Sequence, residues 1–206
     1  MDYSPYLEIA KQRSSQDPAH DFLHVQRVLN NAILILSEIP ADQEVVIPAI
    51  LLHELFTYSK GDPRSRYSGD RCAELAMDIL TEHKYPLVKL EKVLECIKFH
   101  SFSRGVIPDR IEGKIVQDAD RLDSIGAIGV ARCFASCAEM ERPFYDLNDP
   151  FAQGRELDDI HYGLDHFYIK LLKLGENMHT APAKSMAHKR TAFMLGFLQE
   201  FKNEII

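Results

Sequence analysis

The adjacent residues His53 and Glu54 place an imidazole beside a carboxylate inside an apolar run from Pro48 to Phe56. The run predicts a buried helix that Pro48 opens and that continues to about Tyr58. Burying both polar side chains costs several kcal/mol unless they are hydrogen-bonded, ion-paired or coordinated. A hydrogen-bonded pair in the core is one interpretation. A bound cation is the other, and it would also supply chemistry.

A second segment carries histidines at helical spacing. Asp17-Pro18 is typical of a helix start, with an acidic N-cap before a proline, and the apolar period continues until Pro40 stops it. His20 and His24 are four residues apart, so they lie on one side of this helix. A histidine in such a position is either a structural core residue or a metal ligand.

A third segment, from Ile115 to Asp123, holds three acids within about two helical turns. Asp120 and Asp123 share one stripe of the predicted helix, and Asp118 lies on the neighbouring stripe. Taken alone, the acids could form a solvated face. Together with the two histidine segments they favour a metal site built from three parts of the chain.

With these three segments in this order, the sequence resembles the HD-domain superfamily of metal-dependent phosphohydrolases. That family has, in order, a helix with Asp-x-x-His-x-x-Arg-Val, a buried His-Asp doublet, and an Asp in an Ala-Asp-x-Leu context. The matching residues are Asp21, His24, Arg27 and Val28, then His53 and Glu54, then Ala119, Asp120 and Leu122. The match covers about residues 17–130. The run 115–129 and the tail segments 155–159 and 162–168 resemble a branch of small, stand-alone bacterial members.

Carried over by position, the resemblance implies His24, His53, Glu54 and Asp120 as metal ligands. The chain departs from the family at position 54, where the doublet is His-Glu instead of His-Asp. Glutamate keeps the charge and the oxygen donors. Its extra methylene moves the carboxylate by about 1.5 Å, comparable to misplacements that cost about a hundredfold in rate.

Two imidazoles and two carboxylates form a mixed nitrogen and oxygen ligand set, which suits Mn²⁺, Ni²⁺, Fe²⁺, Co²⁺ or Mg²⁺. The chemistry that follows is attack of metal-activated water on a phosphoester or phosphoanhydride. The resemblance implies a small phosphorylated substrate, with nucleotides as the expected class. A degenerate module that binds metal or nucleotide for sensing is the alternative, and a helical interaction protein with structural histidines is a third.

Further candidates surround these ligands. Asp118 or Asp123 could orient the water or act as base. His100 lies on the core stripe of its helix, as either a core histidine or an active-site group that binds a second metal, contacts phosphate or donates a proton. Candidate substrate contacts, with solvated charges as the alternative for the basic residues, are Arg27, Arg64, Ser65, Arg66, Ser101 and Lys114.

Helical periodicity runs through nearly the whole chain, and we find no alternating strand pattern. Ser68 is expected to cap one helix, and Pro86 to start the next. The sequence therefore predicts an all-α fold, a single-domain helical bundle of the HD-domain type over residues 1–206. The metal-site core spans about 17–130, a turn-rich acidic loop about 140–160, and C-terminal helices about 161–204.

Composition bounds the partners and the compartment. A formal net charge of −7 argues against binding to nucleic-acid polymers. Four scattered cysteines favour buried thiols in a reducing compartment. No apolar window is long enough for a membrane span, and the first residues carry no secretion signal. We therefore expect a cytoplasmic protein with no membrane partner; the sequence favours no particular oligomeric state.

Overall fold

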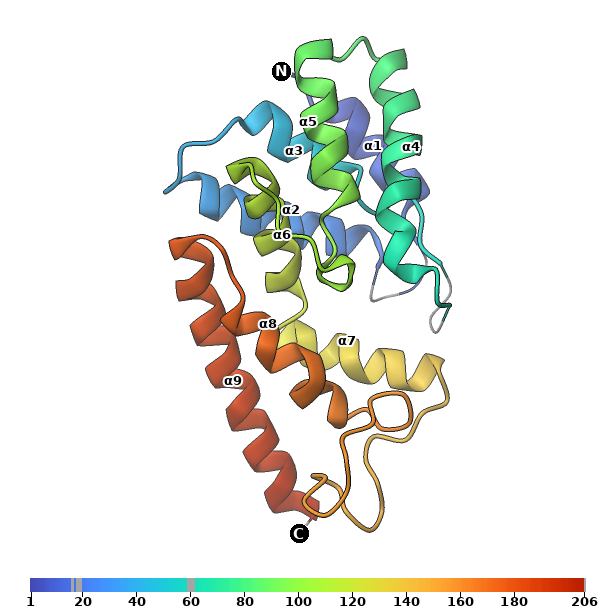
Figure 1. Ribbon diagram of the computed structural model, residues 1–206, viewed down its shortest axis with the longest axis vertical. Helices are drawn as coiled ribbons and strands as arrows, with labels where there is room; N and C mark the ends of the chain where they lie inside the picture. Colours follow the sequence, from blue (N-terminus) through green and yellow to red (C-terminus); the bar gives the residue numbers. More distant parts are fainter. Residues whose placement is uncertain (16, 18–19, 59–61, 206) are drawn as a thin grey trace. The chain divides into compact units, whose positions relative to one another are not determined.

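The computed structural model describes residues 1–15, 17, 20–58 and 62–205, and every regular element within them is a helix (Figure 1). The predicted all-α fold is confirmed. Among these residues, no helix combines the length and the apolar character needed to cross a membrane. The contacts group the chain into two compact units, Met1–Asp120 and Arg121–Ile206, each described below by itself. The single-domain organisation stays a prediction.

Within the described residues, the first unit has six α-helices and two short 3-10 turns. Their bounds are α1 Ser4–Arg13, α2 Phe22–Leu36, α3 Gln43–Leu51, η1 Ser65–Tyr67, α4 Ser68–Glu82, α5 Leu87–Lys98, η2 Phe102–Arg104 and α6 Ile111–Asp123. Helix α5 packs beside both α3 and α4 (Figure 1). The centre is closed by fully buried apolar side chains such as Val28, Ile50, Leu80, Ile97 and Ile115. Helix α6 continues past Asp120 into the second unit.

Helix α2 begins at Phe22, later than predicted, because Asp21 is its N-cap. The Asp21 carboxylate accepts a hydrogen bond from the backbone N–H of His24 at 2.9 Å, which satisfies one of the helix's unpaired donors. Asp17 precedes the helix, and Pro18 lies outside the described residues. This start places His24 in the first turn of α2, directly after the N-cap.

Helix α3 differs more strongly from the expectation. It begins at Gln43, contains Pro48 in its interior and ends at Leu51, so Pro48 does not open a helix that continues to Tyr58. A proline inside a helix leaves the carbonyl four residues earlier without its N–H partner. Here that carbonyl belongs to Glu44, and the Tyr85 hydroxyl donates to it. This long-range contact permits the proline.

The next two helices begin where the sequence predicted them to begin. Helix α4 begins at Ser68, but Tyr67 occupies the N-cap position without a side-chain hydrogen bond, so the predicted capping role of Ser68 is wrong. The Ser68 hydroxyl instead accepts from the backbone N–H of Tyr58 at 3.5 Å, at the limit of a hydrogen bond. Helix α5 follows Pro86 directly.

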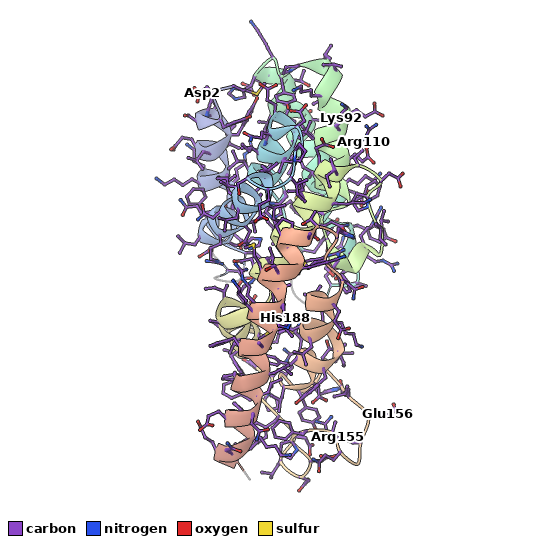
Figure 2. The ribbon with its side chains drawn as sticks, turned by 90° about the vertical axis from the view of Figure 1, so that its left-hand side faces the viewer. Asp2, Lys92, Arg110, Arg155, Glu156 and His188 are labelled. Carbon is purple, nitrogen blue, oxygen red and sulfur yellow. The ribbon has the colours of Figure 1, made fainter. Side chains whose placement is uncertain are left out.

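The second unit contains α7 Gly126–Glu139, the π-helical turn η3 Phe167–Leu171, α8 Leu172–Glu176 and α9 Ala181–Ile205. Residues 140–164 form turns and bends, as predicted for the acidic segment. Arg155 organises this segment: its guanidinium donates to both carboxylate oxygens of the buried Asp165, at 2.5 and 2.9 Å. Figure 2 labels Arg155 and its exposed neighbour Glu156.

Gly126, at the start of α7, permits a close approach by α9. Its φ of +76° favours glycine, and an added Cβ would lie 3.0 Å from the Arg190 side chain. Arg190 Nη1 donates to the Leu122 carbonyl at 2.5 Å. The glycine therefore lets Arg190 pair one of the last carbonyls of α6.

Candidate metal centre

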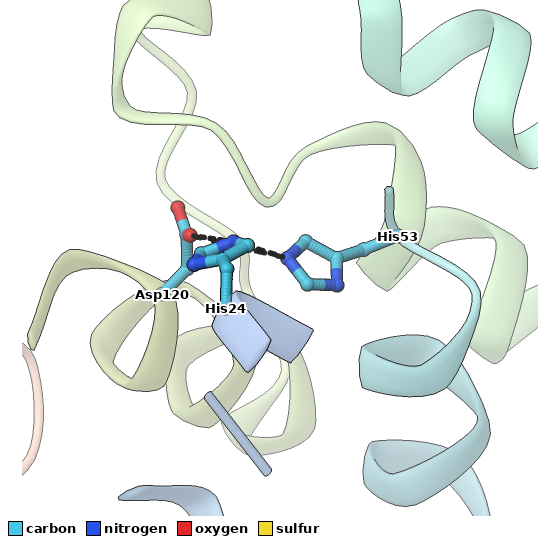
Figure 3. Close-up of side chains that lie close together, drawn as sticks. All are labelled: His24, His53 and Asp120. Carbon is cyan, nitrogen blue, oxygen red and sulfur yellow. Dashed lines mark hydrogen bonds and ion pairs between the residues drawn. The ribbon is translucent and has the colours of Figure 1, made fainter. Parts of the chain in front are cut away.

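The side chains of His24, His53 and Asp120, from three parts of the first unit, lie close together (Figure 3). His24 Nε2 lies 3.3 Å from His53 Nε2 and 3.5 Å from Asp120 Oδ1, and His53 Nε2 lies 3.9 Å from the same oxygen. His24 comes from the first turn of α2, His53 follows α3, and Asp120 lies near the end of α6. Both imidazoles are fully buried, whereas the Asp120 side chain is 18% exposed.

The separations in this cluster fit a metal ion. Three atoms so spaced are equidistant from a point about 2.1 Å from each, and about 2.0–2.2 Å is the usual distance from Zn²⁺ to histidine nitrogen or carboxylate oxygen. The donors are two imidazoles and a carboxylate, a set that borderline divalent cations accept. The cluster could therefore hold one such ion.

His53 is held in the state that a metal requires. Its Nδ1 lies 2.6 Å from the Ile50 carbonyl, which can only accept, so Nδ1 carries the hydrogen. Burial lowers the pKa of His53 to about 3, with help from the neighbouring His100 and His24 and against the opposing effect of Asp120. The neutral ring therefore presents the Nε2 lone pair to the cluster.

The His53–Glu54 doublet does not lie on a helix. Helix α3 ends at Leu51, and residues 52–55 form a turn. The prediction of a continuous helix through the doublet is therefore wrong. The angle of about 100° between adjacent residues of a helix therefore does not fix the directions of these two side chains.

Glu54 lies with His53 and His100 in a second group of potential ligand atoms, all within 4.8 Å of one another. The first such group is His24, His53 and Asp120. Of the four ligands that the family resemblance implied, the structure therefore brings three into one group. Glu54 joins them through His53, the residue that belongs to both groups.

His100 is built into the site in the same way as His53. It lies two residues after the end of α5, is 5% exposed, and directs Nδ1 to the Ile97 carbonyl at 2.7 Å. In His53 the corresponding carbonyl is also three residues back. The two rings meet edge to face with centroids 5.0 Å apart. His100 is thus next to the candidate ligands, and its chemical role stays a prediction.

The two predicted acids on α6 are placed differently from Asp120. Asp118 is fully buried two residues earlier, so it points about 200° around the helix from Asp120. Asp123 belongs to the second unit, where Arg132 Nη1 lies 2.8 Å from its Oδ2. Neither belongs to the two ligand groups among the described residues. Their roles as base or water-orienting group stay predictions.

The predicted phosphate contacts are dispersed. Arg64 is exposed and pairs with Asp62 at 2.7 Å, and Ser65 and Arg66 lie with it in an exposed turn. Ser101 directly follows His100. Arg27 lies one turn after His24 on α2, and Lys114 lies less than two turns before Asp120 on α6. A role in binding phosphate stays a prediction for all six.

Two buried amides that sequence reasoning missed hold the site's elements together. Asn31, two turns after His24, donates from Nδ2 to the Ala119 carbonyl at 3.0 Å. Gln117, three residues before Asp120, donates to the Phe99 and Val106 carbonyls. Their sequence signal was a polar amide on an apolar helical stripe beside a candidate ligand.

Comparison with known proteins assigns the class. The model of the HD domain family matches residues 22–125, half of the chain, from the start of α2 to just beyond α6. The matched region contains the whole candidate metal centre. The chain therefore belongs to the HD domain family, as the resemblance indicated.

Particular relatives match the chain over nearly its full length. YpgQ of Bacillus subtilis is 33% identical over 197 residues, covering 93% of this chain and 87% of YpgQ. The crystal structure of YpgQ in complex with ADP superposes with a TM-score of 0.77 at 29% identity, covering 99% and 98% of the two chains. An HD-superfamily hydrolase from Bacillus thuringiensis gives 0.75 at 31% identity, covering 98% and 95%.

Proposed function

We propose that this protein is a metal-dependent phosphohydrolase that cleaves a phosphoester or phosphoanhydride bond of a small phosphorylated metabolite, specifically a nucleotide. The observation that carries the proposal is the group formed by His24, His53 and Asp120, whose spacing fits one divalent cation. Membership of the HD domain family, with a hydrolase among the solved relatives, supports hydrolysis as the reaction.

The residues divide the work by their burial. His24 and His53, which are fully buried, would hold a cation from the protein interior, and Asp120, whose side chain is partly exposed, would hold it from the side nearer to solvent. When bound, a divalent cation polarises a phosphoryl oxygen and lowers the pKa of water. Glu54 and His100 adjoin His53, where either could hold a proton and where His100 could donate a hydrogen bond to a phosphate oxygen.

A nucleotide substrate is supported by the relative YpgQ, which was crystallised in complex with ADP and aligns with almost the whole chain. Phosphate groups also suit the site, because a cation between imidazoles and a carboxylate offers positive charge to their oxygens. The candidate cations are the five named from the ligand set: Mn²⁺, Ni²⁺, Fe²⁺, Co²⁺ and Mg²⁺.

The test uses the metal-free protein with each cation added back in turn, against nucleoside mono-, di- and triphosphates and a generic phosphodiester. We expect release of phosphate, pyrophosphate or nucleoside only in the presence of metal. His24→Gln should lower the rate at least a hundredfold. Asp78→Asn, at an exposed acid on α4, is the matched control and should leave the rate unchanged. Failure to detect product with any combination would reject the proposal.

A sensing module that binds metal or nucleotide without efficient turnover is the second candidate. It is favoured by the placement of Glu54 beside His100 instead of in the group with His24 and Asp120. Glu54→Asp separates the two candidates. A large gain in turnover would show that glutamate had weakened the site, as a sensor requires, whereas a loss would show that glutamate belongs to a working one.

A further inference from the structure

Gln117 closes a loop beside the candidate metal centre. It is fully buried on α6, one turn before Asp120. Its Nε2 donates to the Phe99 carbonyl at 2.5 Å and to the Val106 carbonyl at 2.8 Å. These carbonyls mark the two ends of the segment 99–106, which contains His100 and the short turn η2. One amide group therefore joins both ends of this segment to the helix that carries Asp120.

The residue type suits this task. A primary amide carries two N–H donors on a single nitrogen, and both point at carbonyls here. Glutamate at this position has no donor when ionised, and methionine has a similar length but cannot donate. Replacing Gln117 by either residue leaves two carbonyl groups without this partner while keeping much of the side-chain volume.

The two hydrogen bonds of Gln117 act on His100 through the backbone of the segment 99–106. His100 directly follows Phe99, and its Nδ1 is already bonded to the Ile97 carbonyl at 2.7 Å. The end of α5 thus fixes the ring on one side, and the Gln117 bond to Phe99 fixes its backbone on the other. Together they hold the ring edge against His53, with centroids 5.0 Å apart.

We propose that Gln117 is a positioning residue that holds the segment 99–106 closed and thereby sets the place of His100 beside His53 and Glu54. The effect on turnover rests on the proposed function, whereas the closure of the segment does not. Gln117 itself contacts neither substrate nor cation in this proposal. It acts through the histidine.

A double-mutant cycle between Gln117→Met and His100→Gln tests the action through His100. We expect Gln117→Met to lower kcat about tenfold or more in the wild-type background. In the His100→Gln background the same change should lower kcat less than twofold, because the positioned group is already gone. Asn31→Leu removes a matched buried amide from α2, and its effect should multiply with that of His100→Gln. If Gln117→Met lowers kcat by the same factor in the wild-type and the His100→Gln backgrounds, the proposal is overturned.

Hydrogen exchange provides a readout that needs no activity. The backbone amides of residues 100–106 should exchange at least tenfold faster in Gln117→Met, while those of α9 keep their wild-type rates and show that the variant folds. The His100 ring signal in NMR spectra of the metal-free protein should shift. Unchanged exchange and an unchanged signal would overturn the proposal even if the wild type is an active hydrolase.

These measurements keep the two claims separate. A wild type without hydrolase activity contradicts the proposed function, and the exchange and ring-signal experiments then decide on Gln117 alone. If Gln117→Met does not fold, Gln117→Asn carries the same experiments, because it keeps both donors but is shorter by one methylene. With that variant we expect smaller changes in the same direction.

Discussion

Asn31 and Ala119 are 88 residues apart in the sequence, yet a hydrogen bond of 3.0 Å joins the Asn31 amide to the Ala119 carbonyl. The bond connects α2 to α6 directly before Asp120. Because Asn31 lies two turns after His24 on the same face of α2, the bond helps to fix the distance between these two candidate ligands.

Asn31→Leu should destabilise the metal-free protein by about 1–3 kcal/mol, because it leaves the buried Ala119 carbonyl without this donor. Urea unfolding measures the change. Asn30→Leu, at the exposed neighbouring position, is the matched control and should stay within about 0.5 kcal/mol of the wild type. Equal effects of the two variants would contradict the importance of the bond.

Adding the preferred cation should stabilise the folded wild-type protein. At a free concentration 100 times its Kd, a ligand specific to the folded state contributes about 2.7 kcal/mol. Asp120→Asn and His24→Gln should lose most of this stabilisation, because each removes a donor from the group of three. Thermal unfolding with and without metal provides the measurement, and full stabilisation of both variants would place the ion elsewhere.

Cys72 and Cys96 should be unreactive in the folded protein. Burial raises the pKa of each thiol to about 12 from an ordinary value of 9.0, so almost no thiolate exists at pH 8. A thiol reagent at pH 8 should modify both rapidly only after unfolding, as mass spectrometry of the two peptides would show. Rapid modification in the native state would contradict their burial.

The same pKa shifts predict how stability depends on alkaline pH. Below about pH 9 both thiols are protonated in the folded and the unfolded chain. Between about pH 9 and 12 only the unfolded chain releases these protons, so stability falls as the pH rises through this window. Cys96→Ala should show a shallower fall in urea unfolding experiments from pH 8 to 10 than the wild type. An unchanged slope would argue against the shift.

Gly126→Ala and Gly196→Ala should have opposite effects. At Gly126 an alanine meets a positive φ and the Arg190 side chain, so we expect destabilisation of more than about 1 kcal/mol. At Gly196, inside α9, a Cβ has nothing within 4 Å, and alanine should stabilise by about 0.5–1 kcal/mol. Denaturant unfolding of both variants measures the contrast, and a shift of the same sign would refute it.

Local patterns predicted much of this structure because they report local physics. The helical periods around His24 and Asp120 follow from side chains spaced along one helix face, and the turn-rich composition of 140–160 correctly indicated an irregular segment. The course of the chain through Pro48 could not be predicted in this way. Pro48 has no N–H to donate to the Glu44 carbonyl. The Tyr85 hydroxyl, 37 residues after Pro48 in the sequence, donates to that carbonyl instead.

In the candidate site, too, some features could be predicted from local patterns and others depend on distant parts of the chain. The types of its ligands were visible in the sequence, but the grouping of Glu54 with His100 depends on where α3 and α5 end. The amides of Asn31 and Gln117 bond to backbone carbonyls on other segments, and a carbonyl has no residue type that a sequence pattern could display.

The turn that carries Glu54 also has a consequence for changing the protein by design. Position 54 lies three residues beyond the last residue of α3, in the turn that follows the helix. The shorter acid, aspartate, can therefore be placed there without a change inside a helix. Position 54 is therefore a place where the reach of the carboxylate beside His53 and His100 can be changed, in evolution or in the laboratory, while the helices of the scaffold are kept.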